Sequence, residues 1–339
     1  SEAEKKYLYI SEKIEKINYS YNYESIKTKL LIAKITLDFY YNVDIYQDID
    51  NLYSFLLKID NISLVYYSYS AIANIMISLH NFNESEKIIK KLEDFSIDSL
   101  DVQTKFIKIR YHLFKKEIDI AKDIFDNLNL SIEVDSNLDL FFTTLNLYIS
   151  LNELELSENL LVDFFKSHTE KESIYYIYAL IFKSVIYYKN NSNREEDYSD
   201  IFLSAIKLMY KSKSISILCE FSNDIVEVIN IILYELNKKI RFSINSYLDL
   251  SFFDQLLVFS YQKINRETSE SLDLSITFTK REIELLELLE SRISNTEMSK
   301  KLFISPNTLK THIKNIYKKL KVNDREEALI KYKAIVGSK

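Results

Sequence analysis

The near absence of glycine and proline constrains the fold of this chain more than any other feature. Its 339 residues contain one glycine and one proline. Sheets and α/β folds need glycine at tight turns and bulges, so we predict an all-α fold. Because the single glycine is Gly337, the chain has neither a phosphate-binding loop nor a dinucleotide-binding glycine motif. A doubly wound receiver domain is equally disfavoured.

A short pattern recurs every 36 residues in the region before residue 262. A small residue stands at Ser85, Ala121 and Ser157, and a bulky residue stands three positions before each of them. Each copy follows an apolar, helix-like run. A period in the mid-thirties is typical of helical pairs that stack into an α-solenoid. The pattern resembles a degenerate tetratricopeptide repeat and is clearest over residues 25–170.

Stacked helical pairs bind peptides or protein partners on their concave side, and the acids and bases here are spread along solvated faces. We therefore expect no enzymatic activity, no catalytic residue and no cofactor. Tyrosine is abundant in this region, for example at residues 66–69 and 175–178. These tyrosines either fill helix–helix interfaces, which we weight more heavily, or line a ligand-binding groove.

Several other kinds of site are not expected. Cys219 is the only cysteine, so no intramolecular disulfide can form, and a reducing, cytoplasmic location is expected. The four histidines are scattered without metal-ligand spacing, so we expect no metal site. No charge-free apolar run approaches 18 residues, so no association with a membrane is expected.

Charge is distributed unevenly along the chain. Residues 275–339 hold 14 basic and 8 acidic residues, whereas the rest of the chain holds 30 basic and 42 acidic ones. A basic C-terminal region suits DNA, which would repel the acidic remainder. The polar stretch 263–275 reads as a linker. The predicted domains are therefore residues 1–262 and residues 276–339, joined by this linker.

Local signals divide the basic region into four short helices. Two begin at S/T-x-x-E capping boxes, one begins at Ser305 followed by proline, and the last begins at Asp324. The predicted helices span residues 280–291, 295–302, 306–320 and 325–335. The second and third are joined by a tight turn, and the third is basic, as in the helix-turn-helix of DNA-binding proteins.

The helix predicted over residues 306–320 has two different faces. Its apolar residues recur at helical spacing and predict a buried stripe, formed by Leu309, Ile313, Ile316 and Leu320. Lysines project from roughly the opposite side, at Lys310, Lys314 and Lys318. His312 lies at the edge of the stripe and is predicted to pack there.

This region resembles the C-terminal DNA-binding domain of the LuxR/FixJ-type transcription factors, from Phe278 to about Ile335. The matching elements are Thr279-Lys280-Arg281-Glu282, Ser294-Asn295, Lys301-Leu302, Ser305-Pro306-Asn307-Thr308, Lys310-Thr311-His312, Lys319-Leu320 and Arg325-Glu326-Glu327-Ala328. Two glycines that the family carries in turns are Arg292 and Lys321 here, so those turns are expected to be set differently. The resemblance implies a four-helix, LuxR-type helix-turn-helix domain.

The resemblance also implies roles for individual residues. Those expected to reach base edges in the major groove are Lys310, Thr311 and Lys314. Those expected to contact phosphates are Ser305, Asn307, Thr308 and Lys318. In the last helix, Ile330 and Ala334 point away from the side predicted to face the core. They form a candidate homodimer contact, which the resemblance supports.

Together these features predict a transcription regulator. Its solenoid receives a ligand, such as a peptide, or a protein partner, and its C-terminal domain binds double-stranded DNA as a homodimer. Two alternatives stay open. In the first, the chain is an adaptor or scaffold whose solenoid binds protein partners. In the second, the chain is the C-terminal part of a larger LuxR-type activator with an ATPase upstream.

Overall fold

The regular structure of this protein is helical throughout the residues that its computed structural model describes, which confirms the all-α prediction. The described residues are 23–40, 45–95, 98–128, 137–171, 173–190, 197–212, 215–242, 250–265, 278–291, 293–320 and 322–336. The chain divides into two compact units, residues 1–239 and residues 240–339. Among the described helices, none combines the length and apolar character that crossing a membrane requires.

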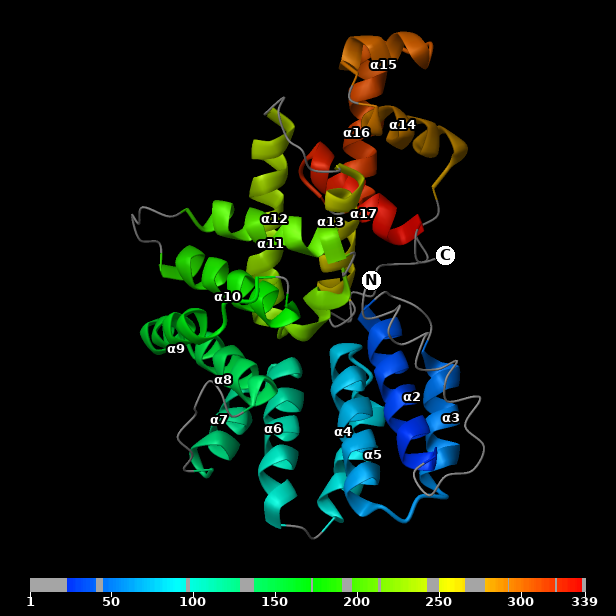
Figure 1. Cartoon of the computed structure of the whole chain (residues 1–339). Coiled ribbons are helices and arrows are strands. Elements are labelled where there is room, and N and C mark those ends of the chain that lie inside the picture. The colour runs from blue at the N-terminus through cyan, green and yellow to red at the C-terminus, as the bar shows by residue number, and fades with distance from the viewer. Residues whose placement is uncertain are drawn as a thin grey trace. The chain divides into compact units, whose positions relative to one another are not determined.

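The N-terminal unit is built from consecutive helix pairs (Figure 1). Its helices are α2 (Tyr23–Tyr40), α3 (Tyr46–Leu56), α4 (Ile62–Ser78), α5 (Phe82–Glu93), α6 (Asp98–Phe114), α7 (Ile118–Asp126), α8 (Leu138–Ser150), α9 (Leu154–Ser167), α10 (Ile174–Asn190), α11 (Tyr198–Ser212), the 3-10 helix η1 (Ser216–Glu220) and α12 (Asn223–Phe242), which crosses the boundary between the units. The pairs run from α2 with α3 to α10 with α11. The first helix of each pair also packs on the first helix of the next. We call α2, α4, α6, α8 and α10 the first-helix row.

Three of these pairs repeat with the 36-residue period of the sequence. The small residues Ser85, Ala121 and Ser157 are fully buried in the first turn of α5, α7 and α9, respectively. A larger side chain at these positions would have to displace closely packed neighbours, and this explains why the pattern keeps a small residue there.

The turns inside these three pairs are built alike, without glycine. Each contains a residue in the left-handed conformation, namely His80 (φ 59°), Lys116 (φ 61°) and Asn152 (φ 62°). The amide of the following residue donates to the carbonyl five positions back in each turn, for example Asn81 N to Met76 O at 2.9 Å. This is the hydrogen bond of the Schellman motif, which commonly ends helices at a glycine. Here histidine, lysine and asparagine adopt the conformation instead.

The C-terminal unit contains α13 (Leu250–Asn265), α14 (Lys280–Glu290), α15 (Asn295–Lys301), α16 (Pro306–Leu320) and α17 (Arg325–Val336). The bounds of α14 to α17 agree with the four predicted helices to within one residue. These helices enclose one buried core, formed by Leu285, Leu286, Leu289, Met298, Leu302, Leu309, Ile316, Leu320, Val322, Ala328 and Leu329.

The boundary between the two compact units lies before α13, whereas the sequence placed the domain boundary within the residues of this helix. The sequence-based boundaries assigned residues up to 262 to the N-terminal domain, whereas the two compact units meet after Lys239. Helix α13 packs along α17, so it belongs with the C-terminal helices. The first residues of the predicted linker, 263–265, end α13, and residues 266–275 lie outside the described part of the chain.

Candidate functional site

The helices of the C-terminal unit begin where their side-chain caps place them. Thr279 Oγ1 accepts from the amide of Glu282 at 3.2 Å, and the Glu282 carboxylate accepts from the amide of Thr279 at 2.8 Å. Ser294 and Glu297 exchange the same two hydrogen bonds at 3.2 and 2.9 Å. Both predicted capping boxes are therefore present. Such reciprocal bonds satisfy amides that the helix itself leaves without acceptors.

The turn before α16 is fixed by similar local bonds. Ser305 Oγ accepts from the amide of Thr308 at 3.1 Å, so Ser305 is the N-cap of α16 as predicted. The hydroxyls of Ser305 and Thr308 also lie 2.8 Å apart. Phe303 takes the left-handed conformation in this turn (φ 55°), and its side chain is 95% exposed. The turn thus sets α16 against α15 without a glycine.

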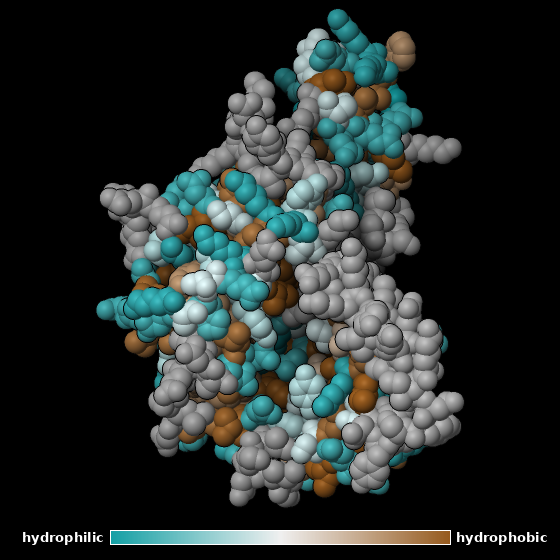
Figure 2. Space-filling view, viewed as in Figure 1, coloured by the Kyte–Doolittle hydropathy of each residue, from teal (hydrophilic) through white to brown (hydrophobic). Residues whose placement is uncertain are grey.

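Helix α16 has the two faces that its sequence predicts. Leu309, Ile316 and Leu320 are completely buried, and Ile313 packs against the same core. The residues predicted to contact DNA are all exposed, namely Ser305, Asn307, Thr308, Lys310, Thr311, Lys314 and Lys318. Hydrophilic residues cover most of the visible surface of these helices, at the top of Figure 2. His312 is half-buried at the edge of the stripe.

The exposed lysines of α16 carry uncompensated charge. Lys310, Lys314 and Lys318 make no salt bridge within the part of the chain that the structure describes. Thr311 is engaged locally, because its hydroxyl donates to the carbonyl of Asn307 at 3.1 Å. The Thr311 side chain is nevertheless exposed. Three positive charges at one-turn spacing form a surface suited to the phosphates and base edges of a nucleic acid.

Other basic residues of this unit have structural roles instead. Lys319 Nζ lies 2.8 Å from the Glu282 carboxylate and 5.3 Å from the centre of the Phe278 ring, so it joins α16 to α14. Arg325 Nε donates to the carbonyl of Leu289 at 2.9 Å. Arg281 donates to the carbonyl of Leu302. The two arginines thereby donate to carbonyls at the C-terminal ends of α14 and α15, where the helix itself supplies too few amide donors.

The Glu282 carboxylate is held ionised by these contacts. Burial opposes its ionisation, but the hydrogen bonds from Lys319 and from Thr279 outweigh burial and lower the pKa of Glu282 below its ordinary value. One side chain therefore closes the capping box of α14 and fixes the C-terminal end of α16.

Comparison with known families identifies this unit. Residues 276–332 match the family described as "Bacterial regulatory proteins, luxR family". The C-terminal region is a LuxR-family helix-turn-helix domain. In it, α15, the turn at Phe303 and α16 form the helix-turn-helix.

Known transcription regulators are similar to short stretches of this chain, of about the length of this domain. The "CsgBAC operon transcriptional regulatory protein" of Escherichia coli is 46% identical over 55 residues, which are 16% of this chain and 26% of that protein. The "Transcriptional regulatory protein LiaR" of Bacillus subtilis is 46% identical over 54 residues, with the same two shares. The "HTH-type transcriptional regulator MalT" of Vibrio campbellii is 34% identical over 67 residues, or 20% of this chain and 7% of that protein. The chain thus spans well under two thirds of these regulators. No solved structure matches the chain significantly.

The predicted dimer contact lies on α17 of the LuxR-family domain. Ile330 was expected to lack an intramolecular partner, but it is half-buried in the structure. The side chain of Ala334 lies outside the described residues, as do both turn positions where family glycines are replaced, Arg292 and Lys321. The homodimer therefore stays a prediction, and α13 already occupies part of the α17 surface.

The described tyrosines of the N-terminal unit occupy different environments. Tyr66 is buried in a helix interface, with 2% exposure. Tyr67, Tyr175 and the mostly buried Tyr178 border a cavity on the first-helix row. Tyr176 borders a second cavity. Sequence periodicity alone did not distinguish Tyr175 from Tyr176, which are neighbours in the chain.

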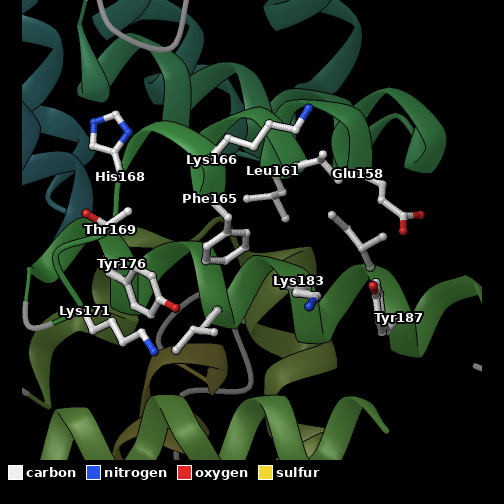
Figure 3. Close-up of a pocket in the computed structure, with 13 residues that line it drawn as sticks. Glu158, Leu161, Phe165, Lys166, His168, Thr169, Lys171, Tyr176, Lys183 and Tyr187 are labelled. Carbon is white, nitrogen blue, oxygen red and sulfur yellow. The ribbon is translucent and has the colours of Figure 1, made fainter. Parts of the chain in front are cut away.

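The second cavity lies between α9 and α10 and has a volume of about 500 Å³. Figure 3 shows Phe165 at its centre, with Tyr176 and Lys171 on one side and Lys183 and Tyr187 on the other. Lys183 Nζ lies 5.9 Å from the ring centre of Phe165 and 5.3 Å from that of Tyr187. The lysine charge is therefore directed at aromatic rings of the cavity wall. Among the described residues of the whole chain, no group of three or more metal-binding side chains is present.

Proposed function

We propose that this chain is a cytoplasmic transcription regulator that binds double-stranded DNA through α16. The exposed face of Lys310, Lys314 and Lys318 carries the proposal, because it stands on a LuxR-family scaffold and lacks internal ion pairs among the described residues. Lys310, Thr311 and Lys314 read base edges, whereas the phosphates are held by the remaining exposed side chains, Ser305, Asn307, Thr308 and Lys318. The relatives that match this domain are named as transcription regulators.

We further propose that the N-terminal unit is a tetratricopeptide-like α-solenoid that senses a ligand or a partner. Consecutive helix pairs, a period of 36 residues and a continuous first-helix row support this assignment. Binding on the row changes how the LuxR-family domain engages DNA. Two chains bind together at paired half-sites, through the Ile330 and Ala334 side of α17.

The test is a titration of short, fluorescently labelled DNA duplexes with the full chain. Fluorescence anisotropy monitors binding at several salt concentrations. Binding that weakens steeply with added salt is expected, because lysines displace counterions from the phosphates. Replacing both Lys310 and Lys314 by alanine should abolish preference for a selected site. Lys207→Ala, an exposed lysine of α11, is the matched control and should leave binding unchanged. If the chain does not bind duplex DNA at low salt, the result would favour the adaptor alternative.

A further inference from the structure

A cavity of about 450 Å³ lies on the first-helix row. Its walls come from all five helices of the row and from η1, and the described second helices of the pairs contribute nothing to its lining. The cavity is contained within the N-terminal unit. Its volume falls in the range of about 300–1,000 Å³ that is typical of sites for small ligands.

The charges on the cavity wall do not cancel. Arg110, Asp139 and Glu220 are the charged residues of the lining. Arg110 Nη2 donates to the Glu220 carboxylate at 2.6 Å and to Ser78 Oγ at 2.6 Å, so Arg110 and Glu220 form a neutral pair. Within the described residues Asp139 makes no salt bridge, and the Tyr175 hydroxyl donates to its carboxylate at 3.3 Å. The wall thus retains one negative charge, at Asp139.

The surroundings of Asp139 shift its pKa upward. Burial raises the pKa of this carboxyl, and the Glu220 charge raises it further, against the attraction of Arg110 and the hydrogen bond from Tyr175. The Asp139 side chain is nevertheless exposed, so solvent screens these effects and a ligand in the cavity can reach the carboxylate. A cation that enters the cavity would favour the ionised form by supplying the missing opposite charge.

Aromatic rings line the same cavity. Phe142 stacks on Tyr175, with ring centres 5.8 Å apart and planes at 11°, and on Phe182, at 5.9 Å and 14°. Tyr178 meets Phe142 edge-on at 5.6 Å. Ring faces attract organic cations and pack against apolar groups, whereas they are not ligands for hard metal ions. The wall therefore suits an organic cation rather than a metal.

We propose that this cavity binds a protonated amine attached to an aromatic or apolar body, with Asp139 as the counter-ion of the amine. Tyr175 orients the carboxylate, and the aromatic cluster of Phe142, Tyr178 and Phe182 receives the body of the ligand. The inference rests on the proposed sensing role, for which it names the chemical class of ligand. Two sources share this chemistry, a free aromatic amine and the amino terminus of a short peptide.

Binding is measured by isothermal titration calorimetry on the full chain without DNA. Tyramine and the tripeptide amide Phe-Leu-Leu represent the two sources, and their N-acetylated forms are the neutral controls. We expect at least one free amine to bind at least tenfold more tightly than its acetylated form. Whichever of the two binds more tightly identifies the source. Equal affinity of the free and acetylated forms, or no binding of either amine, would overturn the proposal.

Matched variants separate the cavity from a general effect on folding. Asp139→Asn keeps the shape of the side chain and should weaken amine binding at least tenfold, while binding of the acetylated form stays unchanged. Tyr175→Phe keeps the ring and should weaken amine binding a few-fold. Asp123→Asn, on the exposed side of α7, and Tyr176→Phe, in the other cavity, should leave amine binding unchanged. An Asp139→Asn chain that still prefers the free amine contradicts the assignment.

The same reagents distinguish this inference from the proposed function. If the amine binds through Asp139 but leaves the DNA affinity unchanged, the cavity assignment stands and the sensing role fails. If the chain binds DNA but does not discriminate free from acetylated amines, the cavity assignment fails and the proposed DNA binding stands.

Discussion

Asp254 of α13 lies 3.6 Å from Lys333 of α17, and Lys333 also lies 2.8 Å from Glu290 of α14. These side chains remain about a third exposed or more, so ion pairing alone contributes little to holding α13 in place. Phe253 and Leu256 of α13 are also buried, each 1% exposed. Helix α13 packs along α17 and lies within the compact C-terminal unit.

The first prediction concerns where the C-terminal unit begins. A fragment that starts at Ile240 retains α13, whereas one that starts at residue 271 exposes the surface of α17 that α13 covers. We expect the shorter fragment to be less stable by at least about 2 kcal/mol, roughly the value of one fully buried large apolar side chain. Urea unfolding followed by circular dichroism measures this difference. Equal urea midpoints for the two fragments would show that the contact of α13 with α17 does not stabilise the unit.

Both fragments also test electrostatic shielding by the acidic N-terminal region. Without that region, binding to random duplex should tighten, most visibly at low salt. A fragment starting at Ile240 that binds random duplex no better than the full chain would show that the acidic region does not influence DNA binding.

The second prediction separates two lysines of one helix face. Lys314→Ala removes a base contact and should cost about 1–3 kcal/mol at the cognate site, with a much smaller effect on random DNA. Lys318→Ala removes a phosphate contact, so it should weaken binding to the cognate site and to random DNA alike. It should also reduce the slope of log affinity against log salt concentration by about 1. Anisotropy titrations on both duplexes give the comparison. Equal losses for Lys314→Ala on the two duplexes rule out its reading of bases.

The third prediction concerns the homodimer. Ile330→Asp should abolish cooperative binding to an operator with two half-sites, while the affinity for a single half-site survives. Because Ile330 is half-buried, the melting temperature of the variant is an essential control. Unfolding of the C-terminal unit would place Ile330 in its core. Cooperativity that persists in a folded variant would exclude this side of α17 as the dimer contact.

The fourth prediction uses the pKa of Glu282. Its folded-state pKa lies below the ordinary value of a glutamate, about 4.3. Its stabilising effect is therefore complete above that value and is lost as the pH falls through the lowered folded value. Glu282→Gln can keep the capping box but removes the charge that pairs with Lys319, so it should lower the unfolding free energy by about 1 kcal/mol at pH 7. This difference should disappear in strongly acidic buffer.

A neighbouring glutamate provides the control for Glu282. Glu284 is about half exposed and pairs with Arg281 at 2.7 Å, three residues away on the same helix. Glu284→Gln should change stability by less than about 0.5 kcal/mol at any pH, as exposed pairs usually do. Calorimetric scans at both pH values compare the two variants. If both variants lose stability equally, the link from Glu282 to Lys319 has no special role.

The fifth prediction tests the turns that replace glycine. Asn152 sits at φ 62°, which glycine adopts freely and a β-branched residue strongly resists. Asn152→Gly should change stability by less than about 0.5 kcal/mol, whereas Asn152→Val should cost about 2 kcal/mol. Asn51→Val, at an exposed position inside α3, is the control and should be nearly neutral, since the helix propensities of the two residues are similar. A tolerated valine at position 152 would mean that this turn adopts another conformation.

Much of the geometry of the candidate nucleic-acid interface was predictable, because it depends on local interactions. Capping boxes act over three residues, so Thr279 and Ser294 locate the starts of α14 and α15 without knowledge of any partner helix. The stripe from Leu309 to Leu320 likewise places the lysines on the outer face of α16. The uses of Arg281 and Arg325 were not predictable, because each donates to a carbonyl more than twenty positions away.

The amino-acid sequence by itself determined the helical class, the 36-residue period and the order of helices in the LuxR-family domain. These follow from composition, side-chain spacing and caps, which act within one or two helical turns. Only the tertiary structure decided that α13 packs along α17. Only it directed Tyr175 and Tyr176 into different cavities and brought Arg110 to Glu220 across 110 positions of the chain. Such contacts depend on which helix faces meet, and the buried area that selects among possible pairings is a property of the assembled core.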